Sequence, residues 1–268
     1  MRHPRSYVRR TYRTWTREAP DLVSFEVRIQ ETDLFVRLGP AAGGGGGREA
    51  DVAAWRRFVE QLVREARRGL EAFLAVDPAF WTALAPRPVP PHAPRLVRRM
   101  ARAAEAAGVG PMAAVAGAIA AEVGEKLREQ TSEVVIENGG DLYLASRQPL
   151  TVAVFAGESP FTGLLGLRLP PEKLPTGVCT SAGTVGPSLS FGSADAAVVV
   201  APDAALADAV ATAAGNRVHS AADLQAAADW ALTVPGVAGA LLVKGDHLAV
   251  AGEVELVRLP AYHTRLTS

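Results

Sequence analysis

Hydrophobic and polar residues follow two different periods in the N-terminal third of the chain. Apolar and polar side chains alternate over Leu22–Ile29 and Asp33–Leu38, which predicts two strands of a hairpin, and Tyr7–Thr16 alternates more loosely as a further strand. Over Glu49–Ala75 the apolar side chains recur three and four positions apart instead, which predicts a long amphipathic helix. Gly43–Gly47 predicts a flexible connection between these elements, without the Lys-Ser/Thr that a P-loop requires.

Two helices and a hairpin are predicted for the middle of the chain. The first helix covers Pro94–Ala107, and the second begins at Pro111, a residue favoured in the first turn of a helix. Asn138 and Gly139 then stand between two apolar runs, which is the strongest short-range signal for a tight hairpin turn. We expect Val134–Glu137 and Leu142–Ala145 to be its strands.

The remaining pattern completes an α+β fold. Helix periodicity over Ser220–Leu232 accompanies short apolar runs typical of strands: Thr151–Ala156, Leu165–Leu169, Ala194–Ala201, Ala240–Lys244, Leu248–Ala251 and Glu253–Leu259. Strands are grouped with strands and helices with helices, which favours antiparallel sheets with helices packed on one face. No segment reads as a linker, so we expect one domain over residues 1–268.

Composition narrows the class of protein. The 28 basic and 28 acidic residues give a formal net charge of zero, which argues against a non-specific nucleic-acid binder. One cysteine, Cys179, excludes an internal disulfide framework and a cysteine-based zinc site, and a cytoplasmic location is expected. The basic N-terminus has no apolar core of a signal peptide, and no apolar run predicts a membrane span.

Candidate chemistry concentrates between Gly177 and Asn216. A loop rich in Gly and Ser over Thr180–Gly192 would leave its backbone N–H groups open to a ligand. A helix follows Asp203, a plausible N-cap, and carries Asp208 and Thr212 four residues apart on one face. This pair suits Mg²⁺ held partly by ligand phosphates. The alternative is that both side chains point to solvent, or that Thr212 bonds to a helix carbonyl.

Two further features have a structural and a functional interpretation. The Asn-Gly turn is either a tight turn alone or the place where Glu137, Asn138 and Asp141 gather polar groups at a sheet edge. The face of the helix after Pro111 carries only small residues, which indicates close packing of another backbone or of a flat ligand. Cys179 is either a buried small hydrophobe or a nucleophile.

Four segments together resemble a known family. They are AGVGPMAAVAGAIA (Ala107–Ala120), ENGGDLYL (Glu137–Leu144), CTSAGTVGPSLSFGSADA (Cys179–Ala196) and LADAVATAAGN (Leu206–Asn216). In these segments the chain is similar to the uncharacterised ApbE-like proteins, distant relatives of the ApbE flavin transferases. With the closing strands included, the resemblance covers most of the chain and implies a T-fold-like α+β arrangement.

The resemblance implies roles for particular residues. The Gly-Gly-Asp turn of the flavin transferases matches residues 139–141, their Thr-Ser-Gly segment matches Thr180 and Ser181, and their Ala-Asp-Ala-x-Ala-Thr helix matches residues 207–212. In that family the Asp and Thr of this helix bind Mg²⁺ beside FAD. The enzyme cleaves the FAD pyrophosphate and attaches FMN to a threonine hydroxyl of a partner protein. The chain departs from the pattern because it has no His-x-x-Asp-Pro segment; Ser188–Gly192 stands there.

The candidate site is therefore defined by residues from three motifs. Asp208 and Thr212 are the metal candidates, and Asp141 and Asp195 are candidates for the missing general base. The candidates for binding FAD or FMN are Asn138, Gly139, Gly140, Thr180, Ser181, Gly183, Thr184, Gly186 and Ser190.

Three functions fit this site. The first is a Mg²⁺-dependent enzyme acting on FAD or another pyrophosphate ligand, with a protein acceptor in the transferase case. The second is a non-catalytic flavin- or nucleotide-binding protein, which the missing His-x-x-Asp-Pro segment favours. The third is an enzyme acting on another small molecule in the same pocket. By analogy with T-fold-like sheets, the chain is also expected to form a homo-oligomer, and neither nucleic acid nor membrane is expected as a partner.

Overall fold

The computed structural model describes residues 22–40, 48–183 and 192–260 of the chain. Within them, strands form an antiparallel sheet of eight, in the order β1-β2-β3-β4-β7-β8-β9-β10, and a sheet of three, in the order β11-β6-β5. The bounds are β1 Val23–Ile29, β2 Thr32–Leu38, β3 Val134–Asn138, β4 Asp141–Ala145, β5 Leu150–Ala153, β6 Leu165–Leu169, β7 Thr176–Ser181, β8 Ala196–Ala201, β9 Gly239–Lys244, β10 His247–Gly252 and β11 Glu255–Arg258. The predicted strand Tyr7–Thr16 and the connection Gly43–Gly47 lie outside the described residues.

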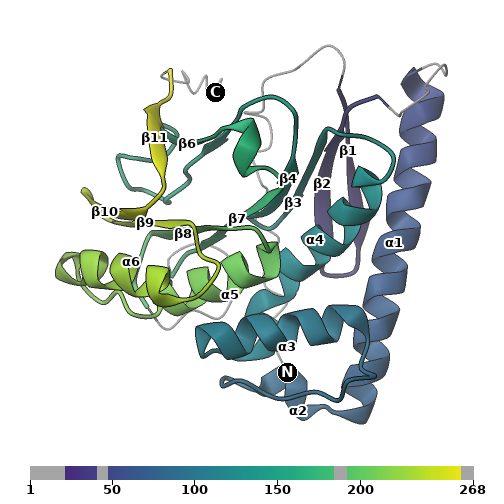
Figure 1. Cartoon of the computed structure of the whole chain (residues 1–268), viewed down its shortest axis with the longest axis horizontal. Coiled ribbons are helices and arrows are strands. Elements are labelled where there is room, and N and C mark those ends of the chain that lie inside the picture. The colour runs from purple at the N-terminus through teal and green to yellow at the C-terminus, as the bar shows by residue number, and fades with distance from the viewer. Residues whose placement is uncertain (1–21, 41–47, 184–191, 261–268) are drawn as a thin grey trace, which may run out of the picture.

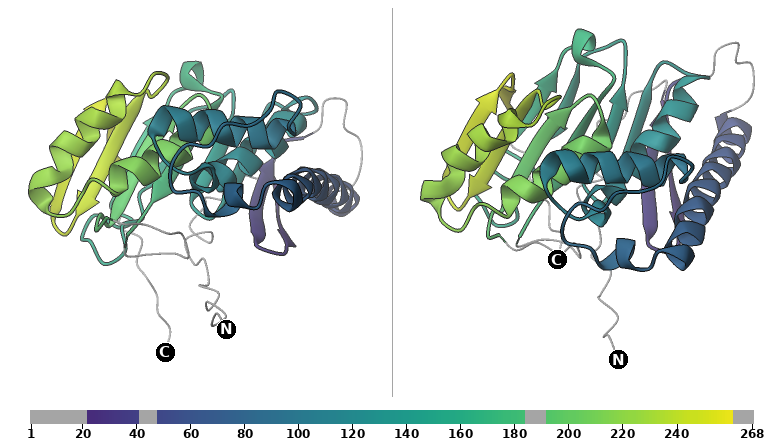
Figure 2. Two further views of the ribbon diagram at one scale, coloured as in Figure 1. Left: turned by 90° about the horizontal axis from the view of Figure 1, so that it is seen from below. Right: turned by 60° about the horizontal axis from the view of Figure 1, so that its bottom comes forward.

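The helices cover one face of the large sheet, and the three-stranded sheet covers the other (Figure 1). Figure 2 shows the same layering, with the longest helix beside the N-terminal hairpin. The bounds are α1 Arg48–Val76, α2 Ala79–Thr82, α3 Arg95–Ala107, α4 Val115–Arg128, α5 Ala204–Gly215 and α6 Leu224–Thr233. The predicted α+β class, with antiparallel sheets and helices on one face, is confirmed.

Two apolar cores follow from this layering. Along β8, Ala197 and Val199 face the helices, whereas Val198 and Val200 face the small sheet. Because both faces are covered, β8 is a continuous apolar run rather than an alternating one.

Helix α5 lies in the middle of the helical layer and is made almost entirely of small residues. Alanines on all its sides are buried, which lets α3, α4 and the sheet approach its backbone. A Cβ atom on Gly117 of α4 would lie 2.2 Å from the Ala204 carbonyl oxygen, and one on Gly177 of β7 would lie 2.4 Å from Ala204 Cα. The small face predicted for the helix after Pro111 is thus a close helix contact.

Several predicted boundaries need correction. Pro111–Ala114 forms a 3-10 turn, and the α-helix proper begins only at Val115. Thr180 and Ser181, predicted in a loop, belong to β7, because they pair with Val198 and Ala197 of β8. The predicted strand Glu253–Leu259 is shorter, β11 Glu255–Arg258, and pairs with β6 in the small sheet.

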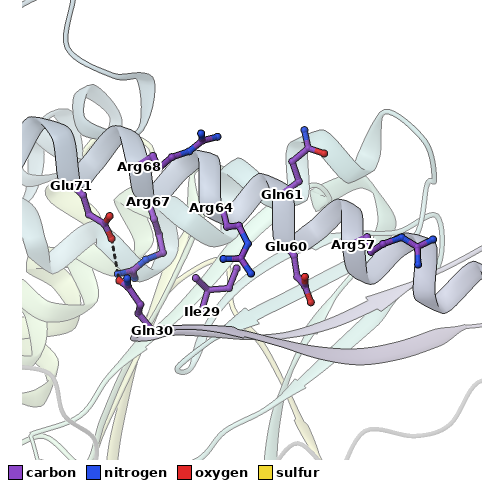
Figure 3. A pocket seen from close by; sticks show the side chains of 9 residues that line it. All are labelled: Ile29, Gln30, Arg57, Glu60, Gln61, Arg64, Arg67, Arg68 and Glu71. Carbon is purple, nitrogen blue, oxygen red and sulfur yellow. Dashed lines mark hydrogen bonds and ion pairs between the residues drawn. The ribbon is translucent and has the colours of Figure 1, made fainter.

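Helix α1 is fastened to the β1–β2 hairpin by arginines. Arg67 donates to Thr32 Oγ1 at 3.0 Å and also bonds Gln30, Glu31 and Glu71. The side chains between helix and hairpin line an open groove of about 490 Å³ (Figure 3). Nearer the start of α1, Arg56 Nη1 donates to the Glu26 carbonyl oxygen on the edge strand β1 at 2.9 Å.

In the described part of the chain, no single helix combines the length and apolarity needed to cross a membrane. Helix α3 and residues 111–128 have the required length and apolarity only when they are taken together, and the two are bent by 106° relative to each other.

Candidate functional site

The turn between β3 and β4 has the geometry that its sequence predicts. Gly139 and Gly140 have φ angles of 72° and 103°, so both central residues adopt the left-handed backbone that Asn-Gly hairpins use. Asn138 and Asp141 close the turn as a cross-strand pair. The buried Glu137 accepts the Gly140 N–H at 2.8 Å through Oε1 and so fixes the turn from one side.

Asn138 connects this turn to the helical layer. Its side-chain amide Nδ2 donates to the Ala116 carbonyl oxygen of α4 at 3.1 Å, and only 6% of the residue is exposed. The turn is therefore held against the beginning of α4.

Asp141 is a buried carboxyl group on the helix-facing side of the large sheet. Its Oδ1 accepts the Thr180 N–H of β7 at 3.3 Å, and the Cys179 thiol is a further hydrogen-bonding neighbour. Burial raises the pKa of Asp141 well above its ordinary value, and the charges of Asp208 and Glu137 raise it further. The raised pKa makes the Asp141 carboxylate a stronger base than an exposed one.

Asp208 comes from α5, whose beginning is capped as predicted: the Asp203 side chain accepts the Ala205 N–H at 2.9 Å. Asp208 Oδ2 accepts the Gly117 N–H of α4 at 2.9 Å, and the Ala116 N–H also bonds this carboxylate. Helix α4 has no cap from its own preceding residue, so Asp208 caps it from a neighbouring helix.

The environment of Asp208 raises the pKa of its carboxyl group. Burial raises its pKa to about 7, although the two N–H groups of α4 act in the opposite direction. Only 9% of the residue is exposed, so the alternative that Asp208 points to solvent is wrong. Asp141 and Asp208, far apart in sequence, thus share one buried, electrostatically coupled region between sheet and helices.

Cys179 is a further buried group in this region. Its thiol donates to the Ala204 carbonyl oxygen of α5 at 3.2 Å and is fully buried. Burial raises the pKa of the thiol well above its ordinary value, and the charges of Asp141 and Asp208 raise it further. A thiol in this environment stays protonated, so the structure favours the buried interpretation over the nucleophilic one.

The other predicted site residues are placed unevenly around this region. Thr212 lies half-buried one turn beyond Asp208, and its hydroxyl makes no hydrogen bond to the described residues. Ser181 is buried near the end of α5, where a Cβ on Gly215 would lie 3.8 Å from its Oγ. Gly183 donates its N–H to the Ala194 carbonyl oxygen at 2.9 Å. Thr184, Gly186 and Ser190 lie outside the described residues.

Asp195 is not brought to the carboxyl pair. Its Oδ2 accepts the Gly245 N–H at 2.6 Å, in the turn between β9 and β10. Its own N–H donates to the Val243 carbonyl oxygen at 2.8 Å. These contacts place Asp195 beyond the start of β8, whereas Asp141 lies further along the sheet beside β7. The positions of Asp195 and Asp141 in the sequence do not show how far apart they lie, because the order of the strands in the sheet decides this distance.

Nowhere in the described residues do three or more His, Cys, Asp or Glu side chains gather in a way that could hold a metal ion. Any cation beside Asp208 would therefore take most of its ligands from a bound molecule, from water or from neutral oxygens.

Sequence analysis missed two contributors to this region. The N–H groups of Ala116 and Gly117 bind Asp208, and their signal was the small-residue face that indicated only close packing. Glu137, which holds the turn, was recognised as polar but not included among the candidate ligands.

With this geometry in view, the chain can be compared with known proteins. The family described as AbpE bacteria matches residues 13–235. The chain belongs to this family. A UPF0280 protein of Methanocella arvoryzae is 45% identical over 207 residues, which is 76% of this chain and 84% of that protein. A UPF0280 protein of Methanosarcina acetivorans is 40% identical over 221 residues, covering 81% of this chain and 87% of the relative.

Solved structures of ApbE proteins are similar to this chain at low identity. The apo flavinyl transferase ApbE of Pseudomonas stutzeri has a TM-score of 0.48 and 12% identity, covering 86% of this chain and 94% of that one. The flavin transferase ApbE of Vibrio cholerae has a TM-score of 0.44 and 12% identity, covering 88% and 96%.

Proposed function

We propose that this AbpE-family protein binds a flavin nucleotide, FAD or FMN, together with Mg²⁺. The binding region would lie where the Asn138–Asp141 turn, the Thr180–Gly183 segment and helix α5 meet, and the reaction would be FMN transfer or FAD pyrophosphate cleavage. The observation that carries the proposal is the meeting of Asp141 and Asp208. Each belongs to a different motif that resembles the flavin transferases, both are buried, and the charge of Asp208 raises the pKa of Asp141.

The residues present fit a magnesium ion. Asp208 offers carboxylate oxygen, the hard donor that Mg²⁺ prefers, and the Thr212 hydroxyl lies one turn away with no described partner. Two neighbouring buried carboxyl groups with raised pKa values are also the arrangement that a divalent cation would relieve. When bound, the cation would neutralise charge on the phosphates of the nucleotide.

The chain's own groups would then orient the ligand and hold a proton. The turn backbone at Gly139 and Gly140 has no side chains to obstruct a close approach. Asp141 would accept the proton of the attacking hydroxyl, while the Thr180 N–H keeps its carboxylate in position. In the transferase case the acceptor hydroxyl oxygen bonds the phosphorus of the FMN half, the bond to the bridging oxygen breaks, and AMP leaves.

A non-catalytic binding protein is the second candidate. The sequence has no His-x-x-Asp-Pro segment before Asp208. Loss of a general base typically costs about two to four orders of magnitude in rate. In this case the same residues would bind a flavin or another nucleotide without converting it.

Calorimetric titration of the purified protein with FAD, FMN and ADP, with and without Mg²⁺, tests the proposal. Asp208→Ala should abolish Mg²⁺-dependent binding, whereas Asp229→Ala, which removes an exposed carboxylate on α6, should not. Release of AMP from FAD would then separate an enzyme from a binding protein. No binding of any of the three ligands by the wild-type protein would overturn the flavin assignment.

A further inference from the structure

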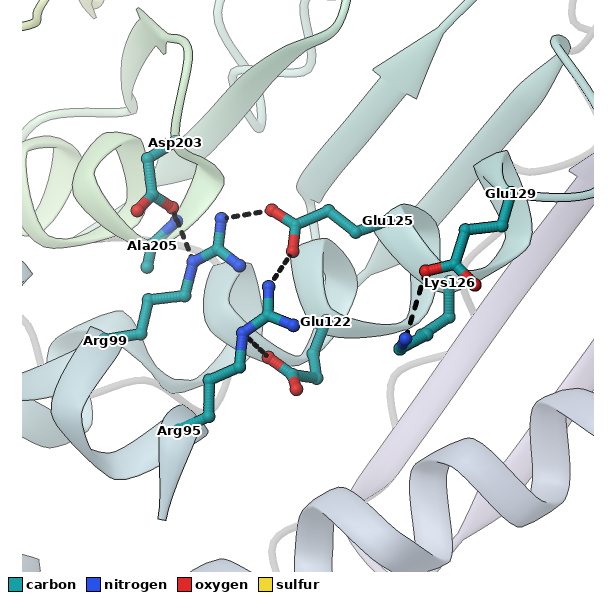
Figure 4. A network of polar contacts seen from close by, with 8 residues as sticks. All are labelled: Arg95, Arg99, Glu122, Glu125, Lys126, Glu129, Asp203 and Ala205. Atoms are coloured by element: carbon teal, nitrogen blue, oxygen red, sulfur yellow. Dashed lines mark hydrogen bonds and ion pairs between the residues drawn. The ribbon is translucent and has the colours of Figure 1, made fainter. Parts of the chain in front are cut away.

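A network of arginines and carboxylates lies beside the crossing of α4 and α5 (Figure 4). Arg99 of α3 donates through Nη2 to Glu125 Oε1 of α4 at 2.8 Å and through Nε to Asp203 Oδ1 at 2.9 Å. Asp203 is the N-cap of α5, so one guanidinium joins three helices. The Arg99 side chain is only 9% exposed, and its burial is compensated by these two carboxylates.

Arg95 offers a comparison within the same network. It lies one turn earlier on α3 and pairs with Glu125 and Glu122, both on α4. Arg95 therefore joins α3 to α4 but does not reach α5, and its side chain is 53% exposed.

The crossing of α4 and α5 is thus fixed at two places. At one, Asp208 accepts the Gly117 N–H; at the other, Arg99 joins Glu125 and Asp203. The backbones touch between these places, because a Cβ on Gly117 would lie 2.2 Å from the Ala204 oxygen. Helix α5 follows its N-cap Asp203 and carries Asp208 within its first two turns, so the polar contacts at its beginning act on the same stretch of helix that presents Asp208.

We infer that Arg99 is a positioning residue for the Asp208 carboxylate. By holding the N-cap of α5 against α4, it sets the direction in which Asp208 presents its oxygens, both to Gly117 and to the cation of the proposed function. The effect of Arg99 on cation binding rests on the proposed function, whereas its effect on the contact between Asp208 and Gly117 is independent of any ligand.

The test compares Arg99→Met with Arg95→Met. Amide hydrogen exchange measured by NMR should show the Gly117 N–H exchanging about ten-fold faster in Arg99→Met while the Val178 and Leu241 N–H groups keep their wild-type rates, with no change at any of the three in Arg95→Met. Equal acceleration of all three amides in Arg99→Met would indicate general destabilisation and contradict the positioning role. Mn²⁺, used as a spectroscopic substitute for Mg²⁺, should bind Arg99→Met about 10–100-fold more weakly by electron paramagnetic resonance. Arg95→Met should stay within about two-fold of wild type.

Asp203→Asn covers the case in which Arg99→Met does not fold. Asparagine still caps a helix but loses the ion pair with Arg99, so this variant should accelerate Gly117 exchange in the same direction. Equal Gly117 exchange in wild type, Arg99→Met and Asp203→Asn would overturn the inference. If Gly117 exchange responds but wild type binds no Mn²⁺, the positioning role stands and the proposed metal site fails.

Discussion

The two faces of the large sheet differ in chemistry although both are buried. The face toward the small sheet is lined by aliphatic side chains such as Leu144, Val178 and Leu241. The face toward the helices has an equally apolar core but also contains Asp141, Cys179 and Asn138. The difference lies in what covers each face.

A covering sheet pairs its backbone groups between strands and leaves them unpaired only at its two edges, whereas a covering helix ends over the core and leaves N–H groups free there. At the beginning of α4 these N–H groups meet Asp208, and the Ala116 carbonyl oxygen meets Asn138. Polar side chains are therefore tolerated in the helical layer at the place where a helix begins. A candidate site belongs on this face because buried charge has partners there.

The largest effect is expected from opening a cavity on the aliphatic face. Leu241 is fully buried against the small sheet, so Leu241→Ala should lower the free energy of unfolding by about 4 kcal/mol. Urea denaturation measures the loss. Mn²⁺ affinity should not change at temperatures where the variant is folded, because the candidate metal ligands Asp208 and Thr212 lie on α5, on the other side of the large sheet. A parallel loss of Mn²⁺ affinity would show that the two faces are not independent.

Adding one methyl group to each of the two covering layers should give unequal results. Gly117→Ala places its Cβ 2.2 Å from a backbone oxygen, which cannot move without separating α4 from α5, and should cost about 3 kcal/mol. Gly166→Ala on β6 places its Cβ 2.8 Å from Thr151 Cγ2, 3.0 Å from Leu259 Cδ2 and 3.3 Å from the Val152 carbonyl oxygen. The nearest backbone atom is thus about 1 Å farther away than for Gly117→Ala, so a smaller loss of about 1 kcal/mol is expected. Equal losses in thermal unfolding would contradict this account of the helix contact.

A smaller effect should appear as a pH dependence of the cation-free protein. The pKa of Asp208 is about 7 in the folded protein, above its ordinary value, so the folded state binds more protons than the unfolded state between these values. Stability should therefore fall as pH rises, by on the order of 2 kcal/mol between pH 5 and pH 8. Chemical denaturation with a chelator present measures it.

Asp208→Asn is the matched variant for the pH series, since the amide oxygen can still accept the Gly117 N–H without titrating. Its stability should depend less on pH than that of wild type. Asp141, whose pKa is also raised, accounts for the slope that remains. An unchanged slope in Asp208→Asn would remove Asp208 from the explanation.

Local signals in the sequence predicted much of this structure. The Asn138-Gly139 turn, the Asp203 cap and the long helix α1 depend on neighbours within a few residues, and each was found where expected. Thr180 and Ser181 were assigned to a loop because small polar residues surround them. Their pairing with β8 is a tertiary fact that no local pattern contains.

The candidate site was also predictable in part from local motifs in the sequence. Resemblance to known motifs identified Asp141 and Asp208, and the fold places both in one region. The partnership of Asp208 with α4 was not predictable, because it depends on how two helices cross whose bonded residues, Gly117 and Asp208, are 91 apart in sequence. Asp195, the other candidate for the general base, lies at the β9–β10 turn and not beside Asp141, because the strand order decides which residues lie together.

The contact between Arg56 and the Glu26 carbonyl oxygen has a consequence for self-association. β1 is one edge of the large sheet, and an uncovered edge strand can add a strand from another chain. At Glu26 the acceptor that such a strand would need is already occupied by a guanidinium from α1. Edge-to-edge assembly of two copies through β1 would therefore have to displace that arginine from Glu26.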